Sequence, residues 1–247
     1  MTSTNNMRCL FISDLHLQAS RPDLTRALLD FLDDQASQCQ QLYILGDLFE
    51  AWIGDDAIPA DQQPVLEALK KLSDQGVELF FQHGNRDFLI QQKFAELTGC
   101  TLLPEAITVE LPAGPALLMH GDQLCTDDHE YMQFRQLLRN PQWQTDFLSK
   151  TLAERLDIAQ QLRAASQSKN AEKSMAIMDV NQQAVTQAMH NANVNLLIHG
   201  HTHRPATHEL GHGLRRIVLG DWDTEGWFLD CTETGEELIS FAISGNE

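Results

Sequence analysis

The stretch Cys9-Leu10-Phe11-Ile12-Ser13-Asp14-Leu15-His16 decides how this chain is organised. A short apolar run, typical of a buried β-strand, ends in two potential metal ligands, Asp14 and His16. Alternate residues of an extended strand point the same way, so we expect the carboxylate and the imidazole to converge on one point. An Asp-x-His pair alone indicates little, because chance supplies many such pairs.

Four further turns repeat this arrangement, each with potential ligands directly after an apolar run. They read Leu45-Gly46-Asp47, His83-Gly84-Asn85-Arg86-Asp87, Leu118-Met119-His120-Gly121-Asp122 and Ile198-His199-Gly200-His201-Thr202-His203. Chance does not readily produce so many turns of one kind. We therefore interpret them as parts of a single site.

The size and charge of the chain limit its class. Its 247 residues, 43% of them hydrophobic, predict one large α/β domain or a domain with an insert. The net charge of -18 argues against non-specific nucleic-acid binding, which depends on Lys and Arg. The five cysteines are odd in number and show no Cys-x-x-Cys spacing, so we expect a reducing cytoplasm, no disulfides and no thiolate metal ligands.

Membrane-spanning and secretory segments are not expected. Residues 1–8 hold no apolar core of signal-peptide length. No apolar run reaches the ~18 residues that a membrane span needs. We expect a cytoplasmic protein that binds a membrane at most peripherally.

The chain alternates between predicted strands and helices before it becomes richer in strands. Helices are expected at 22–38, 62–75 and 88–98, and strands at 9–12, 42–45, 77–81, 116–119 and 195–198, with antiparallel strands within 102–119 and several short strands within 207–241. This order predicts an α/β sandwich with its helices outside. In such sheets, sites lie at the carboxyl ends of the strands.

A helical insert separates two of the ligand turns. No strand is evident from 121 to 194, where helices are expected at 130–138, 143–166 and 172–191. This length exceeds the ~10–15 residues of an ordinary crossover. We therefore expect a catalytic core of 1–122 and 194–247 and an inserted helical cap of 123–193.

The insert differs from its acidic host in charge. Between Tyr131 and Lys173 it carries seven basic and four acidic residues, which suits an anionic substrate. Its apolar side chains permit two interpretations. They pack the helices together, or some of them line an acyl-chain groove or touch a bilayer.

The candidate ligands are carboxylates, imidazoles and one amide, without sulfur. That set suits Mn²⁺, Fe²⁺ or Zn²⁺, and its oxygen content favours Mn²⁺ over a structural zinc. One four-coordinate ion cannot use all of these ligands. Two ions about 3.5–4 Å apart with a bridging carboxylate can, and such a pair polarises a phosphoryl oxygen and activates water for in-line attack.

The ordered turns resemble the signature of the calcineurin-like metallophosphoesterases, across the whole chain apart from the insert. The resemblance implies a four-layer α/β/β/α sandwich, in agreement with the expected elements. It also implies two metal sites that share Asp47. The implied ligands are Asp14, His16, Asp47 and His203 for one ion, and Asp47, Asn85, His120 and His201 for the other. Asp87 and Asp122 are expected to orient ligands as hydrogen-bond acceptors.

Arg86 departs from the family pattern, which usually has histidine there, assigned to the leaving group. An alkoxide leaving group needs a proton from a general acid, and arginine stays charged at neutral pH. Arginine can instead clamp phosphate oxygens and neutralise charge on a leaving phosphate. Arg86 therefore indicates a pyrophosphate substrate.

Arg86, the insert and the stretch from Leu45 to Asp56 resemble a narrower group, the UDP-2,3-diacylglucosamine pyrophosphohydrolases of lipid A biosynthesis. The resemblance implies water attack on the α-phosphorus, giving UMP and 2,3-diacylglucosamine 1-phosphate. It assigns catalysis to Asn85 and Arg86. The implied substrate contacts are Asn85, Arg86, Asp128, Ser166, Asn170, Lys173 and His201. A substrate with two acyl chains also implies peripheral binding to the anionic cytoplasmic face of the bacterial inner membrane.

Two other functions remain open. A generic metal-dependent phosphodiesterase or phosphatase would use the same ligands, although the insert and Arg86 argue against it. A non-catalytic scaffold on the same fold would be expected to lose ligands, and this chain has the full set.

Overall fold

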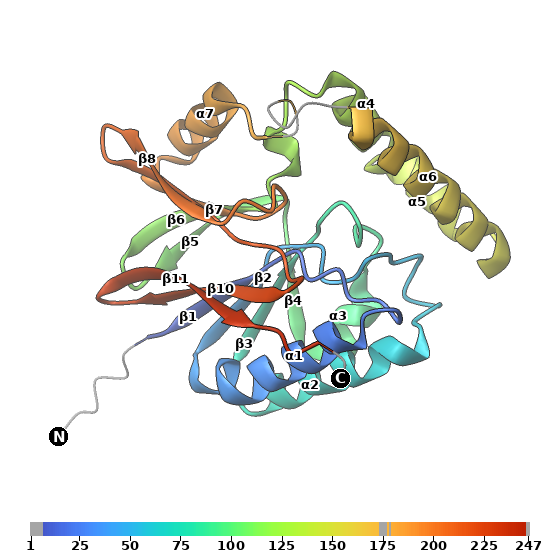
Figure 1. The fold of residues 1–247 in the computed structure, drawn as a ribbon, viewed down its shortest axis with the longest axis horizontal. Helices are drawn as coiled ribbons and strands as arrows, with labels where there is room; N and C mark the ends of the chain where they lie inside the picture. Colours follow the sequence, from blue (N-terminus) through green and yellow to red (C-terminus); the bar gives the residue numbers. More distant parts are fainter. Residues whose placement is uncertain (1–6, 173–176, 178, 246–247) are drawn as a thin grey trace.

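The computed structural model describes residues 7–172, 177 and 179–245, and for 166–172 it describes only the helical backbone. This part of the chain forms two stacked sheets with helices on their outer faces and a separate group of helices at one end (Figure 1). None of its helices combines the length and the apolar character that a membrane crossing requires.

Both sheets mix parallel and antiparallel strands. The first has the order β11 (Gly235–Ala242), β10 (Glu225–Thr232), β1 (Cys9–Ile12), β2 (Gln41–Ile44), β3 (Glu78–Gln82) and β4 (Cys100–Leu103). The second has the order β5 (Ala106–Leu111), β6 (Gly114–Met119), β7 (Leu196–His199), β9 (Leu214–Val218) and β8 (Ala206–Gly211). β1 to β4 are parallel, as are β6, β7 and β9, whereas β10 and β5 pair antiparallel with their neighbours.

Alternation along β1 assigns its side chains to two different cores. Leu10 and Ile12 face the helices, while Cys9 and Phe11 face the second sheet, and all four are fully buried. A strand covered on both faces must be apolar throughout, which explains the uninterrupted run. The expected sandwich is thus confirmed.

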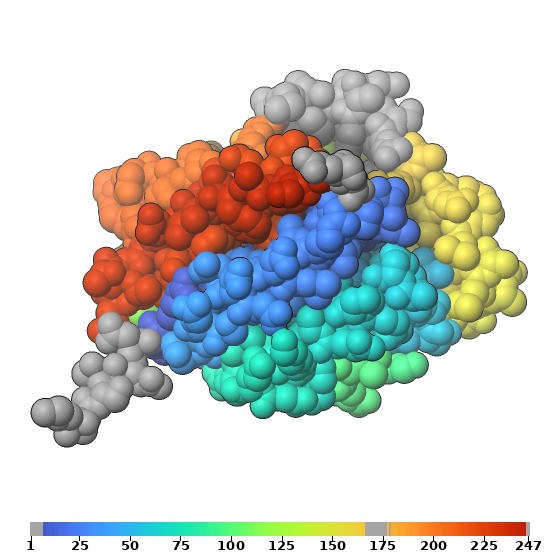
Figure 2. All heavy atoms as spheres, turned by 60° about the horizontal axis from the view of Figure 1, so that its bottom comes forward, coloured from blue at the N-terminus to red at the C-terminus, as the bar shows by residue number. Residues whose placement is uncertain are grey.

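Helices complete the outer layers. α1 (Pro22–Asp34), α2 (Gln63–Asp74) and α3 (Gln92–Thr98) cover the first sheet, where α1 and α2 lie side by side (Figure 2). α7 (Gln182–Ala192) covers the second sheet through Val185 and Met189. The four layers are therefore helices, first sheet, second sheet and α7. Short 3₁₀ helices span Ala36–Gln38, Ala60–Gln62 and Asp122–Leu124.

The helices at one end are α4 (His129–Leu138), α5 (Pro141–Leu148) and α6 (Leu152–Glu172) (Figure 1). Here "cap" denotes α4 to α6. The expected insert of 123–193 also contains α7, which packs as an outer layer of the sandwich. We therefore propose that the cap ends before α7 and that α7 belongs to the core.

Four expected helices have clearly different bounds in the structure, and the one expected at 22–38 ends as an α-helix at Asp34. The helix expected at 88–98 begins only at Gln92, because Asp55 accepts hydrogen bonds from the backbone N–H groups of Gln91 (3.0 Å) and Phe94 (2.9 Å). The Asp55 carboxylate that accepts these bonds belongs to a distant loop, so a local sequence pattern cannot reveal where this helix begins. The helix expected at 172–191 begins at Gln182, where Asn181 accepts from Gln183 N and Ala184 N.

The helix expected at 143–166 is two helices. α5 ends at Leu148 and α6 begins at Leu152, and Thr151 and Glu154 bond reciprocally at the start of α6. Thr-x-x-Glu is a capping box, so this boundary was readable in the sequence and was missed.

Candidate active site

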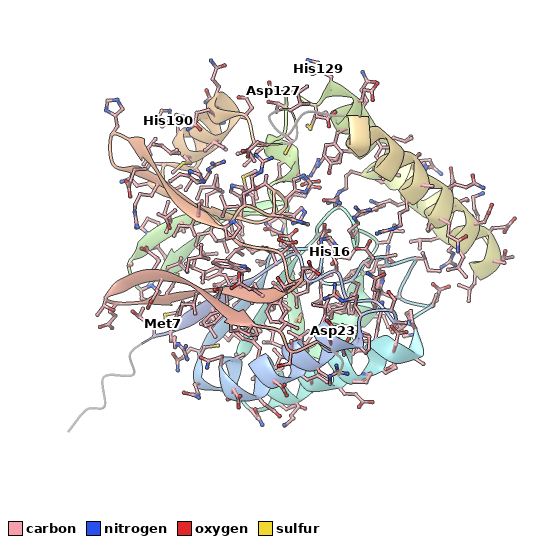
Figure 3. The ribbon with its side chains drawn as sticks, viewed as in Figure 1. Met7, His16, Asp23, Asp127, His129 and His190 are labelled. Atoms are coloured by element: carbon pink, nitrogen blue, oxygen red, sulfur yellow. The ribbon has the colours of Figure 1, made fainter. Side chains whose placement is uncertain are left out.

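All five ligand turns meet at one edge of the sandwich. They follow the carboxyl ends of β1, β2, β3, β6 and β7. The turns of the first sheet are bonded to each other, since Asp14 N donates to Gly46 O at 3.0 Å and His16 N to Asp47 O at 3.0 Å. In the second sheet Gly200 N donates to His120 O at 2.9 Å. Figure 3 shows His16 in the middle of the molecule, where these turns converge.

The first group of ligand atoms surrounds the Nε2 atom of His16. This atom lies 3.3 Å from His203 Nε2 and 3.9 Å from Asp47 Oδ2. His203 Nε2 is in turn 3.5 Å from Asp14 Oδ1. Asp14 Oδ1 is buried and accepts no hydrogen bond within the described chain. Nitrogen and oxygen atoms that can bind a metal thus gather around one point, an arrangement that a divalent cation stabilises.

The second group surrounds His120. Its Nε2 atom lies 3.1 Å from Asn85 Oδ1 and 3.7 Å from Asp47 Oδ2, and its ring centroid is 5.1 Å from that of His201. The structure therefore brings all seven residues expected as metal ligands together, with Asp47 facing both groups. Among the described residues, Asp14 also joins both clusters capable of holding an ion, Asp14-His16-His203 and Asp14-Asp47-His120.

The backbone, not strand alternation, makes these side chains converge. Asp14 (φ 58°), His16 (φ 51°), Asp47 (φ 53°), His201 (φ 67°) and His203 (φ 54°) all adopt the left-handed conformation. Our expectation of an extended Asp14-x-His16 segment is therefore wrong, although the two side chains do converge as expected. Each such residue costs on the order of 1–3 kcal/mol of strain and persists only where the surroundings over-determine it.

Glycines let the turns approach closely. A Cβ atom on Gly46, whose φ is +88°, would lie 2.4 Å from Gly84 N and 2.7 Å from His120 Nδ1. Only glycine fits between these two turns. The Gly46-Asp47 and Gly84-Asn85 pairs are thus packing requirements as well as ligand carriers.

A second set of acceptors orients the ligands from behind. His120 Nδ1 lies 2.7 Å from Leu45 O, His16 Nδ1 lies 2.8 Å from Glu50 Oε2, and His203 Nδ1 lies 3.3 Å from Asp221 Oδ2. For His120 this hydrogen bond from Nδ1 leaves Nε2 as the metal-binding nitrogen, and in His16 and His203 a carboxylate likewise lies beside Nδ1.

Sequence reasoning did not assign Glu50 or Asp221. Leu219-Gly220-Asp221 repeats the pattern of Leu45-Gly46-Asp47, so the sequence did carry a signal for Asp221.

Asp87 and Asp122 organise the site in different ways. Asp87 accepts from Gly84 N (2.9 Å) and Leu48 N (2.8 Å), which ties the Asn85 turn to the Asp47 turn. Burial and the nearby Asp47 raise the pKa of Asp87 to about 7. Asp122 instead accepts from Tyr131 Oη and Arg135 Nε of α4, at 3.1 and 2.8 Å. Both of these donors belong to the cap.

Burial and neighbouring charges shift the pKa values of the His201 and His203 imidazoles in opposite directions. Burial lowers the pKa of His201 to about 4, with the nearby His120 acting in the same direction. Burial alone would also lower the pKa of His203, but the Asp14 and Asp221 carboxylates outweigh it and raise that pKa to about 10. At neutral pH His201 is therefore neutral and ready to bind a metal, whereas His203 must first lose a proton.

A pocket extends from this site under the cap. Its cavity volume is about 110 Å³, and its walls combine cationic and amide groups near the turns with apolar cap side chains. Arg86 lies at the junction, with its backbone N–H bonded to Asp47 Oδ1 at 2.7 Å and its Nε buried without a partner among the described residues. The apolar wall residues include Phe88, Phe134, Leu138, Trp143, Phe147 and Leu162.

Four arginines hold the cap against core carboxylates. Arg155 forms a two-point pair with Asp56 (2.6 and 2.9 Å). The other three arginines also pair with core carboxylates: Arg135 with Asp122 and Glu105, Arg139 with Glu105, and Arg163 with Glu50. The basic excess of the insert therefore serves largely to seat the cap on an acidic core.

The expected substrate contacts in the insert are only partly described. Asp128 is buried and caps α4 by accepting from Tyr131 N at 3.0 Å. Its neighbours Asp127 and His129 mark the start of α4 in Figure 3. The side chains of Ser166 and Asn170, and the whole of Lys173, lie outside the described residues.

Comparison with known proteins identifies the family of the chain. The calcineurin-like phosphoesterase family model matches residues 7–205. A Cellvibrio japonicus protein named UDP-2,3-diacylglucosamine hydrolase is 52% identical over 96% of this chain and 100% of its own length. A Pseudomonas aeruginosa protein of the same name is 48% identical over the same shares.

Among solved structures, an archaeal phosphodiesterase superposes with a TM-score of 0.50 at 13% identity, covering 95% of this chain and 100% of its own, and supports the fold. The extent of the family match and the identity to these relatives lead to one conclusion. The chain belongs to the calcineurin-like phosphoesterase family.

Proposed function

We propose that this protein hydrolyses the pyrophosphate of UDP-2,3-diacylglucosamine by water attack on the α-phosphorus, releasing UMP and 2,3-diacylglucosamine 1-phosphate. The observation that carries the proposal is the single pocket in which Asn85 and Arg86 meet the apolar side chains of the cap. A nucleotide sugar with two acyl chains needs both kinds of wall. The names of relatives that align over nearly the whole chain support the same substrate.

Two Mn²⁺ ions are the cofactors that we propose. The donor atoms are imidazole nitrogens, carboxylate oxygens and one amide oxygen, which suits Mn²⁺. Bound ions would polarise a phosphoryl oxygen and activate water. Asp14, His16, Asp47 and His203 would hold one ion, and Asp47, Asn85, His120 and His201 the other.

Arg86 and Asn85 would act on the substrate. The guanidinium of Arg86 would bind the phosphate that leaves with the sugar and neutralise its charge as the bond breaks. Because its backbone is tied to Asp47, it approaches the phosphate from a fixed position. The amide of Asn85 would bind a phosphoryl oxygen beside its metal. Asp128, Ser166, Asn170, Lys173 and His201 are the further substrate contacts that we propose.

The test is product analysis with UDP-2,3-diacylglucosamine and Mn²⁺ in ¹⁸O-labelled water. We expect UMP that carries the label and an unlabelled sugar phosphate. Label in the sugar phosphate would place the attack on the β-phosphorus instead. Cleavage of bis-p-nitrophenyl phosphate with no release of UMP would favour the generic phosphodiesterase. Parallel assays with Fe²⁺ and Zn²⁺ test the choice of metal.

Reversible binding to the cytoplasmic face of the bacterial inner membrane, through the insert, is also proposed. Leu137, Leu152 and Leu156 expose 52%, 45% and 50% of their surface, and Leu152 and Leu156 share a face of α6. Flotation with anionic liposomes should show binding by the wild type and several-fold less by a Leu152→Asn/Leu156→Asn variant. Equal flotation of both proteins would count against this membrane contact.

A further inference from the structure

Glu50 is the one carboxylate in the described chain that pairs with both a metal-site histidine and a cap residue. It lies in the loop after Asp47, and its side chain is 12% exposed. Its Oε2 atom is 2.8 Å from His16 Nδ1, while Oε1 pairs with the guanidinium of Arg163 on α6. The Arg163 guanidinium also donates to the backbone carbonyl of Glu50 at 3.5 Å.

The backbone of Glu50 is tied to the segment that carries His16. Glu50 N donates to Leu17 O at 3.1 Å, and Leu17 N donates to Leu48 O at 2.9 Å. Glu50 therefore cannot shift without moving the neighbour of His16. Toward His16 its carboxylate lies 2.8 Å from Nδ1 and holds the ring on that side, while Nε2 faces Asp47 and His203.

Asp221 provides a natural comparison. It stands behind His203 as Glu50 stands behind His16, with Oδ2 3.3 Å from His203 Nδ1. Within the described residues it makes no ion pair with the cap. Glu50 and Asp221 thus each place a carboxylate beside the Nδ1 atom of a ligand histidine, but among the described residues only Glu50 also contacts α6.

We propose that Glu50 is a positioning residue that couples the metal site to the cap through the chain His16–Glu50–Arg163. Metal binding fixes the His16 ring, which fixes Glu50 and strengthens its grip on Arg163. By reciprocity, a seated cap strengthens metal binding by the same factor. The inference rests on the metal binding of the proposed function and does not depend on the identity of the substrate.

The experiment measures Mn²⁺ affinity by titration and hydrogen exchange of residues 152–165, with and without saturating Mn²⁺. In the wild type we expect Mn²⁺ to slow exchange in this segment several-fold. Glu50→Gln should weaken Mn²⁺ binding about 10–100-fold, the usual scale for removing an acceptor behind a ligand, and should abolish the change in exchange.

Asp221→Asn is the matched control, because it should weaken Mn²⁺ binding similarly yet keep the slowing of exchange at saturation. Arg163→Met alters a side chain that is 35% exposed and leaves the ligands in place. It should abolish the slowing and lower Mn²⁺ affinity by the factor by which Mn²⁺ slows exchange in the wild type. This variant also keeps the test decisive if Glu50→Gln does not fold.

Three results would overturn the coupling. Mn²⁺ could bind the wild type without changing exchange in α6, in which case the metal site stands and the coupling fails. Glu50→Gln and Asp221→Asn could behave identically in exchange. Finally, absence of Mn²⁺ binding to the wild type would overturn both the coupling and the manganese site of the proposed function.

Discussion

The ligand turns and the cap are held in place by different means. The turns lie at one edge of the two sheets with Asp14, Asp47 and His120 buried, and five of their ligand residues adopt the left-handed conformation. The cap rests on ion pairs from four arginines and presents exposed leucines to solvent. The strained backbone of the turns requires many supporting contacts. The cap has fewer such contacts and can open locally more easily. Changes in the turns should therefore abolish chemistry, and changes in the cap should mainly alter binding.

The largest effect is expected for Asp47→Asn. Asp47 is 2% exposed and faces both ligand groups, so its carboxylate is the one that both ions would share. Two-metal occupancy and turnover should collapse together, by on the order of 10³-fold or more in kcat/KM. Metal analysis beside steady-state kinetics checks this, with circular dichroism as the folding control. Full activity with two bound metals would refute the bridging role.

Arg86 lies where the two regions meet and should give the next largest effect. Arg86→Ala should lower kcat/KM for the UDP-sugar by at least ~10²-fold, the usual loss for one transition-state donor. Arg86→His should stay poor on the pyrophosphate but gain relative activity on an unactivated phosphodiester, because an imidazole can protonate an alkoxide. The measurement is kcat/KM for the UDP-sugar and for the phosphodiester, for the wild type and both variants at matched Mn²⁺. If Arg86→Ala cleaves the UDP-sugar at the wild-type rate, the argument for a pyrophosphate fails.

Metal binding should depend on pH through the turns and not through the cap. Because the raised pKa of His203, about 10, keeps it protonated at neutral pH, a metal must displace a proton. Mn²⁺ affinity should rise with pH between 7 and 9, by up to about tenfold per unit for one proton. The folding stability of the metal-free protein should change in the opposite direction and fall as the pH rises. The stability from protonated His203 is complete below the unfolded pKa and is lost as pH rises through about 10.

Calorimetric Mn²⁺ titrations at several pH values check this dependence. Asp221→Asn removes one cause of the raised pKa, so its rise in affinity should move to lower pH. An affinity that does not change across this range would contradict the proton displacement.

The smallest effect is expected for Arg155→Met, which loosens the cap alone. Arg155 is buried and bonds Asp56 together with the carbonyls of Ile53, Leu148 and Lys150. Loss of these bonds should destabilise the cap by about 2 kcal/mol. Hydrogen exchange in α6 should accelerate and KM should rise about tenfold with kcat nearly unchanged.

Lys150→Met is the control for Arg155→Met, because it removes an exposed positive charge from the same segment. If Arg155→Met lowers kcat as strongly as Asp47→Asn, the proposed separation between turns and cap is wrong.

The sequence by itself determined the sandwich and gathered the ligand turns at one edge of it, and its resemblance to the metallophosphoesterases supplied the ligand set that we propose. Short apolar runs such as Cys9–Ile12 are typical of strands covered on both faces, and polar turns after parallel strands gather at one edge. These inferences use periodicity and residue chemistry, which are local properties. The capping box at Thr151 was equally local, and its omission was an error of interpretation.

Only the tertiary structure decided how the ligands converge and what supports them. The left-handed segment of Asp14 and His16 is hydrogen-bonded to Gly46 and Asp47, in the turn after β2 some thirty residues away. The start of α3 depends on Asp55, and the cap depends on arginines paired with distant carboxylates. Glu50 shows the reason. Its importance lies in joining His16 to Arg163, and contacts between segments far apart in the chain leave no periodic trace in either segment.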